Sequence, residues 1–116
     1  YWDVWIIEYG EKTVGICGLY SNDHLDNSEL WLGWLGILPQ YRRCGIGGVA
    51  IDFMEMEAAK VGCKKLRDYI YPDYNDPLPY YNKKGFELMN TPQNSEYEGY
   101  FLISKEIAAK NYRNLL

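Results

Sequence analysis

The sequence predicts a single domain of the mixed α and β class, in which helices pack on a central β-sheet. Three observations support this prediction. Runs rich in β-branched and aromatic residues recur along the chain, the apolar spacing changes to a helical period after residue 45, and 116 residues suffice for one hydrophobic core but not for two. Hydrophobic residues make up 47% and charged residues 24% of the chain, which is ordinary for a globular protein and argues against disorder.

The first part of the chain predicts three strands. Two β-rich runs within residues 2–21 flank a Gly-Glu-Lys sequence at residues 10–12, which indicates a hairpin. A polar, turn-rich loop separates this hairpin from a third apolar and aromatic run at residues 29–38. The glycines of the third run, Gly33 and Gly36, indicate a bulge or the close approach of another backbone.

A helix is predicted to start near Gly45, because the apolar spacing takes a helical period from Ile46 onward. Its apolar residues recur at a spacing of three to four and are expected on one face: Ile46, Val49, Ala50, Phe53 and Met56. Charged residues are expected on the opposite face: Asp52, Glu55 and Lys60. Gly62 follows at the position where a left-handed residue commonly ends a helix, so we expect the helix to stop there.

The remaining residues predict a short helix and three more strands. A strand is expected at residues 64–71, and Pro79 suits the first turn of a helix that extends to Lys84. Two final strands are expected at residues 85–89 and 96–107. The predicted order is therefore β-β-β-α-β-α-β-β, a mixed sheet with helices packed on it.

Composition excludes several classes of function. The chain has 16 acidic and 12 basic residues and a net charge of −4, so a general nucleic-acid-binding surface is not expected. No apolar run reaches the roughly 20 residues of a membrane span. One histidine and no Cys-x-x-Cys pair fall short of a zinc site. We expect no metal, a reducing cytoplasmic location and a buried or half-buried position for each cysteine: Cys17, Cys44 and Cys63.

Residues 37–48, with the sequence ILPQYRRCGIGG and named the glycine turn below, predict a binding site for phosphate groups. The segment joins a strand end to a helix start, where backbone N–H groups lack intrahelical partners and the helix dipole favours an anion. Glycine lets the backbone approach a bulky phosphate, and Arg42 and Arg43 add cationic donors with several N–H groups. The combination predicts a pyrophosphate site.

Two known phosphate-binding motifs fit this segment poorly. A P-loop would continue with Lys and Ser or Thr, whereas Val49 and Ala50 follow Gly48. The dinucleotide-binding pattern G-x-G-x-x-A is matched, but its first glycine should end the strand directly, and here six residues intervene. The acid expected after that pattern should close the next strand, whereas Asp68 lies inside the strand predicted at residues 64–71.

The glycine turn resembles the acetyl-CoA-binding motif of the GNAT acyltransferase superfamily, Q/R-x-x-G-x-G/A, with Arg42, Gly45 and Gly47 at its defining positions. Residues 80–87, YYNKKGFE, are similar to a second motif of that family, with Tyr81 on its tyrosine. The resemblance covers residues 1–107 and implies a mostly antiparallel sheet flanked by helices. It also implies a GNAT domain at residues 1–107 that lacks the family's usual N-terminal strand and two helices, followed by a tail at residues 108–116.

The resemblance implies roles for individual residues. Tyr81 is expected to be the general acid, and Glu29, at the start of the third strand, is the candidate general base. The residues expected to bind acetyl-CoA are Ile37 and Leu38, through their main chain, with Arg42, Arg43, Cys44, Gly45, Ile46, Gly47, Gly48 and Asn75. We expect the side chains of Ile37 and Leu38 to belong to the core. Asn75 lies six residues before Tyr81, whereas the family places its asparagine seven residues before the tyrosine.

The resemblance implies an N-acetyltransferase that moves the acetyl group of acetyl-CoA to a primary amine by direct attack in a ternary complex. The acceptor is expected to be a small molecule or a peptide, with no metal, nucleic acid or membrane involved, and homodimer formation stays open. The alternative from another class is a domain that binds acyl-CoA without turnover, as a sensor or an interaction module.

Overall fold

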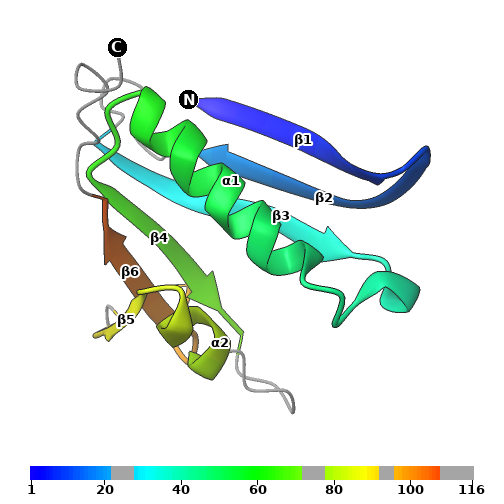
Figure 1. Cartoon of the computed structure of the whole chain (residues 1–116). Helices are drawn as coiled ribbons and strands as arrows, with labels where there is room; N and C mark the ends of the chain where they lie inside the picture. The colour runs from blue at the N-terminus through cyan, green and yellow to red at the C-terminus, as the bar shows by residue number, and fades with distance from the viewer. Residues whose placement is uncertain (22–27, 72–77, 92–95, 108–116) are drawn as a thin grey trace.

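The computed structural model describes residues 1–21, 28–71, 78–91 and 96–107 (Figure 1). Its order of elements confirms the predicted order, with a short 3₁₀ helix added. The strands are β1 (Trp2–Tyr9), β2 (Lys12–Tyr20), β3 (Glu29–Ile37), β4 (Lys65–Ile70), β5 (Glu87–Met89) and β6 (Phe101–Glu106). The helices are η1 (Pro39–Tyr41), α1 (Ile46–Lys60) and α2 (Leu78–Lys83).

The described strands form one mixed sheet in the order β1-β2-β3-β4-β6-β5. All neighbours are antiparallel except β3 and β4, which are parallel and joined by the crossover through α1. Figure 1 shows α1 running back over β2 and β3. Tyr81 of α2 packs against the same hydrophobic cluster as α1, so both helices lie on one face of the sheet. The mixed, mostly antiparallel fold is confirmed.

The parallel strands separate after a short paired segment. Residues 29–31 of β3 pair with residues 65–67 of β4, and no later residue of β3 pairs with a described residue of β4. The two strands diverge toward their carboxyl ends (Figure 1). We name the gap that opens beyond Trp31 and Arg67 the wedge. Among the described residues, main-chain groups of β3 that point into the wedge have no ladder partner there.

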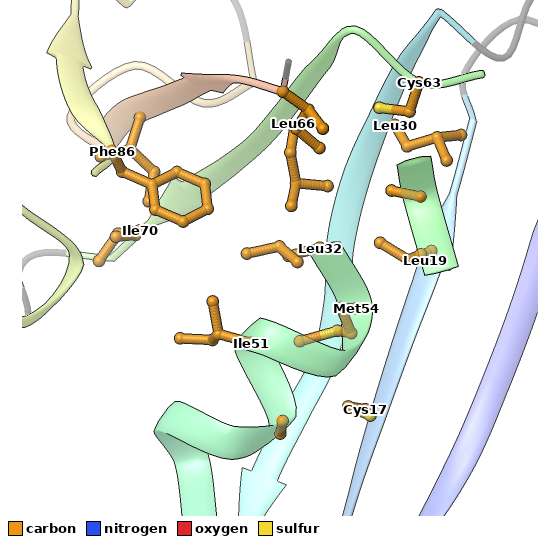
Figure 2. Close-up of a cluster of buried hydrophobic side chains, with 14 residues drawn as sticks. Cys17, Leu19, Leu30, Leu32, Ile51, Met54, Cys63, Leu66, Ile70 and Phe86 are labelled. Atoms are coloured by element: carbon orange, nitrogen blue, oxygen red, sulfur yellow. The ribbon is translucent and has the colours of Figure 1, made fainter. Parts of the chain in front are cut away.

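The hydrophobic core lies between α1 and the sheet (Figure 2). Leu19, Leu30, Leu32 and Leu66 come from three strands, Ile51 and Met54 from α1, and Phe86 and Ile103 from the C-terminal part.

The prediction of which face of α1 is buried was wrong, because the helix is rotated about its axis relative to that prediction. The helix buries Ala50, Ile51, Met54 and Ala58, whereas Val49 is 70% exposed and Met56 38% exposed. Apolar residues surround most of this helix, so periodicity alone allowed more than one face. The buried face combines two alanines, which let the helix come close to the sheet, with Ile51 and Met54, which fill the space between them.

Gly62 ends α1 as predicted. Its φ of +86° lies in the left-handed region, and its N–H donates to the carbonyl of Ala59 at 3.1 Å. The N–H of Cys63 donates to the carbonyl of Ala58 at 3.0 Å. These two bonds form a Schellman motif, which satisfies carbonyl groups of the last turn.

The bulge predicted near Gly33 and Gly36 is confirmed. Two steps along β2, from Ile16 to Gly18, face three steps along β3, from Gly36 to Gly33. Trp34 takes a φ of +56°, and its ring lies over Gly18, where a Cβ would come within 2.6 Å of the ring atom Cε3. A glycine in β2 thus makes room for the tryptophan in the bulge.

Candidate active site

The glycine turn leads the chain from β3 into α1 through two left-handed residues. After η1, Arg43 has a φ of +63° and Gly45, the N-cap of α1, has a φ of +82°. No side chain caps the helix start. A non-glycine residue in the left-handed region costs roughly 1–2 kcal/mol, so Arg43 holds a strained backbone at the predicted phosphate site.

The first turn of α1 presents free N–H groups. The first backbone bond of the helix runs from the N–H of Val49 to the carbonyl of Gly45 at 3.2 Å. In the described part of the chain, the N–H groups of Ile46, Gly47 and Gly48 donate to no backbone carbonyl. With the positive end of the helix dipole, these three donors suit an anion.

Residues of the second motif lie beside this helix start. A Cβ on Gly48 would come within 3.1 Å of the Tyr80 hydroxyl and 3.3 Å of Lys84 Nζ, whereas a Cβ on Gly47 would meet only the Tyr80 hydroxyl, at 3.5 Å. Lys84 Nζ also pairs with the Asp52 carboxylate at 3.1 Å. The fold therefore brings the two sequence motifs together, although more than 30 residues separate Gly48 from Lys84.

The arginines of the glycine turn are exposed. Arg42 Nε donates to the carbonyl of Ile37 at 2.9 Å, which ties the guanidinium to the end of β3. This contact uses one of the five guanidinium N–H donors and leaves four for another acceptor.

The side chains of Ile37 and Leu38 are a correction to the prediction that they belong to the core. Ile37 is half-buried and Leu38 is 44% exposed. Both residues lie at the end of β3, where β4 has diverged and no longer runs beside them. The N–H of Leu38 donates to the carbonyl of Val14 at 2.8 Å, so the main chain stays attached to β2 on its other side.

Cys44 is also a correction, because it is exposed rather than buried. It lies between the two left-handed residues of the glycine turn, and its thiol donates to the carbonyl of Arg42 at 3.6 Å. Cys17 and Cys63 are buried, as predicted.

Tyr81 extends from α2 into the core side of the sheet. Its ring meets Phe86 edge to face at a centroid distance of 5.6 Å, and it is half-buried. Burial raises the pKa of the Tyr81 hydroxyl, and the neighbouring Asp68 carboxylate raises it further. The hydroxyl therefore stays protonated at neutral pH and can donate a hydrogen bond or a proton.

Glu29 lies at the amino end of β3, about 26 Å along the strand from Ile37 at ~3.3 Å per residue. Its side chain is 47% exposed and pairs with Arg67 at 3.6 Å between Oε1 and Nη2. The structure therefore gives Glu29 an ion-pair partner and places it far from the glycine turn. Its role as base stays a prediction, and Asn75 lies outside the described residues.

Asp68 was not among the predicted site residues. It is the first residue of β4 beyond the pairs with β3, and it pairs with Ile103 of β6, whose side chain belongs to the core. Burial raises the pKa of the Asp68 carboxyl to about 7, although the N–H of Tyr69 opposes this shift. One signal was present in the sequence: strand alternation puts Asp68 on the same face as Leu66 and Ile70, both apolar.

An apolar cavity of about 440 Å³ lies on the flank of α1 that faces β1 and β2. It adjoins the glycine turn at Cys44 and Gly45, and Trp5 and Phe53 form part of its wall. Neither Asp68 nor Tyr81 lines it. Its titratable lining residues, Glu8, Tyr9, Cys17 and Cys44, come from β1, β2 and the glycine turn and not from β4 or α2.

The model of the acetyltransferase (GNAT) domain family matches residues 1–88. The chain belongs to this family. Family membership confirms the resemblance deduced from the two motifs and makes the protein an acyltransferase. No curated protein matched the sequence.

Solved structures share the fold at low identity. A GNAT family acetyltransferase from Elizabethkingia anophelis, with acetyl-CoA bound, has a TM-score of 0.77 at 18% identity over 89% of this chain and 74% of its own. The PaiA N-acetyltransferase from Thermoplasma acidophilum, in complex with coenzyme A, has a TM-score of 0.75 at 20% identity over 90% of this chain and 60% of its own. A GNAT family acetyltransferase from Staphylococcus aureus Mu50 has a TM-score of 0.74 at 18% identity over 92% and 69%.

The described residues contain neither a candidate membrane-spanning helix nor a candidate metal-binding group. None of their helices is both long and apolar enough to cross a membrane. No group of three or more His, Cys, Asp or Glu side chains in the same residues could hold a metal ion.

Proposed function

We propose that this GNAT domain transfers the acetyl group of acetyl-CoA to a primary amine by direct attack in a ternary complex. The observation that carries the proposal is the start of α1, where two exposed arginines and three glycines lie together with three N–H groups that donate to no described backbone carbonyl. This set of donors matches the CoA pyrophosphate in charge and in the room that it leaves for a bulky group.

The wedge is where we place the pantetheine arm and the acetyl group of acetyl-CoA. The main chain of β3 beyond Trp31 has no described strand beside it on the β4 side, so it can pair with the extended pantetheine arm as a further strand would. Main-chain N–H groups of β3 then lie where they can polarise the thioester carbonyl, as an oxyanion hole does.

Tyr81 is the group that protonates the leaving thiolate. It lies on α2, next to Tyr80, which in turn lies over the glycines of α1. Its raised pKa keeps the hydroxyl protonated until the thioester C–S bond breaks. In this reaction the amine nitrogen forms the new C–N bond, and the thiolate leaves as the free thiol of CoA.

The first test is a thermal-shift titration with acetyl-CoA, desulfo-CoA and NADH. The two CoA compounds should raise the melting temperature, since a ligand at 100 times its dissociation constant stabilises by about 2.7 kcal/mol. NADH should not, because the glycine turn lacks the dinucleotide-binding arrangement. An equal shift with NADH would contradict the assignment of the site.

Turnover separates an enzyme from a binding module. Acetyl-CoA is incubated with n-butylamine, cadaverine, Nα-acetyl-lysine and a peptide with a free N-terminus, and the released CoA thiol is measured. We expect thiol release above background with at least one amine. Tight binding of acetyl-CoA with background release for every amine would instead support the non-catalytic alternative.

A further inference from the structure

We propose that Asp68 is the general base of the transfer, accepting a proton from the acceptor amine where β3 and β4 part. This inference rests on the proposed function and names the residue that carries one step of it. It replaces Glu29 as the candidate base.

The backbone register places Asp68 at the apex of the wedge. The last pair between the two parallel strands joins Trp31 to Arg67, and Asp68 is the next residue of β4. The same residue pairs with Ile103 on its other side, so β6 holds its backbone in place. An acetyl group held along β3 just beyond Trp31 would therefore lie beside the backbone position of Asp68.

Two tyrosines lie near enough to Asp68 to interact with its charge. Burial raises the pKa of the Tyr81 hydroxyl on α2, and the Asp68 carboxylate raises it further. Tyr20 pairs with Trp31 of β3, and burial, then Tyr97, then Asp68 raise the pKa of its hydroxyl. Asp68 therefore lies close to the proposed proton donor and beside the point where β3 and β4 stop pairing.

The surrounding charges leave Asp68 without an ion-pair partner in the described part of the chain. On the core face, Lys84 pairs with Asp52 at 3.1 Å, and Lys105 of β6 pairs with Glu55 at 2.8 Å. Arg67 pairs with Glu29. Only the N–H of Tyr69 favours the ionised form. A carboxylate that burial weakens as an acid, and that no cation neutralises, is a stronger base than an exposed one.

The protons balance with these two residues. Asp68 takes one proton from the ammonium form of the acceptor, and the free amine then attacks the thioester carbonyl. When the C–S bond breaks, Tyr81 gives its proton to the thiolate sulfur. The nitrogen then loses its second proton, which restores the Tyr81 hydroxyl through Asp68 or water, and Asp68 releases the first proton to solvent.

The test compares Asp68→Asn with Glu29→Gln, using the best of the four amines above. Asn keeps the shape of the side chain but cannot accept the proton. We expect kcat for Asp68→Asn to fall by 10²–10⁴-fold, the usual contribution of a general base, with an unchanged thermal shift by acetyl-CoA. Glu29→Gln tests the alternative base, and a fall of that size in Glu29→Gln but not in Asp68→Asn would return the role to Glu29.

The pH profile distinguishes a base from a merely structural residue. The wild-type kcat/KM should rise with pH through about 7, because Asp68 works only when ionised, and the Asp68→Asn profile should lack this rise. The ¹³C signal of the Asp68 carboxyl in the free wild-type protein should titrate near the same pH, which serves even if the variant fails to fold.

Each outcome has a separate meaning. If the wild-type protein turns over and kcat of Asp68→Asn stays within threefold of wild type, Asp68 is not the base and the proposed function still stands. A titration midpoint of the Asp68 carboxyl below pH 5 would have the same meaning. Binding of acetyl-CoA with no transfer to any amine would overturn both.

Discussion

The glycine turn and the wedge are the two regions to which we assign the proposed function, and they are built in different ways. The glycine turn is a continuous stretch of chain, mostly exposed, whose donors are backbone N–H groups and two arginines. The wedge takes its groups from β3, β4 and α2, and its central carboxyl is partly buried. Under the proposed function, the comparison teaches that the co-substrate is bound by local structure, whereas the chemistry depends on tertiary structure.

This difference has a kinetic counterpart. Changes in the glycine turn should alter the affinity for CoA, because those contacts exist before and during the reaction. Changes in the wedge should alter turnover, because those contacts form as charge develops. The following four predictions test this division.

The largest effect is expected for Tyr81→Phe. Phenylalanine keeps the ring contact with Phe86 but removes the proton donor, so kcat should fall by 10²–10⁴-fold with little change in the KM for acetyl-CoA. Steady-state kinetics of the two proteins measure this. The control is Tyr80→Phe, which should alter CoA affinity more than turnover. A Tyr81→Phe turnover number within about threefold of wild type would remove Tyr81 from the mechanism.

Gly47→Val should weaken CoA binding by roughly 10- to 100-fold, or about 1.4–2.7 kcal/mol. The new side chain would occupy the space where the backbone meets the phosphate, while the nearest protein atom to a Cβ is the Tyr80 hydroxyl at 3.5 Å. Calorimetry at two salt concentrations should give the same loss at both, since the effect is steric. Val49→Ala, at an exposed position of the same helix turn, is the control and should leave affinity unchanged.

Arg42→Ala should weaken CoA binding by about tenfold at low salt, and by less at high salt, because the lost contacts are between exposed charges. Its control is Lys60→Ala, which makes the same change in net charge at the other end of α1. Calorimetry at two ionic strengths decides between a contact with the ligand and a general effect of charge. If Arg42→Ala and Lys60→Ala lose the same CoA affinity, the effect of Arg42 is a general effect of charge and not a contact with the ligand.

The smallest effect is expected for Arg43→Gly. Glycine adopts the φ of +63° without strain, so the free energy of unfolding should rise by about 1 kcal/mol or less, while CoA affinity falls a few-fold. Thermal unfolding and calorimetry measure the two quantities on the same samples. A variant that gains stability and keeps full affinity would show that Arg43 contributes nothing to binding.

Sequence reasoning worked where structure is local. The hairpin, the glycine turn and the end of α1 at Gly62 follow from residues that are neighbours in the chain, and the structure confirms the elements in their predicted order. Leu38 was expected in the core because it ends an apolar run, but a run cannot reveal that the adjacent strand diverges.

Asp68 shows the limit more sharply. Its neighbours in sequence are charged or aromatic, and its significance comes from β3 ending its pairing one residue earlier and from α2 placing Tyr81 nearby. Those are relations between segments far apart in the chain. The one sequence signal was the alternation of Leu66, Asp68 and Ile70, which puts an acidic side chain on an apolar face of the strand. Burying a charge there costs free energy, so such a residue is a candidate for a functional role.

The short pairing between β3 and β4 also bears on how the domain holds together. The sheet is a pair of three-stranded halves whose shared ladder covers residues 29–31 and 65–67, so cohesion between the halves depends on α1, where Ile51 and Met54 pack toward Leu32 and Leu66 (Figure 2). Amides along this seam should exchange with solvent faster than those of the long β1–β2 ladder. A bound pantetheine arm would bridge the seam as an additional strand, so co-substrate binding should slow this exchange in both halves at once.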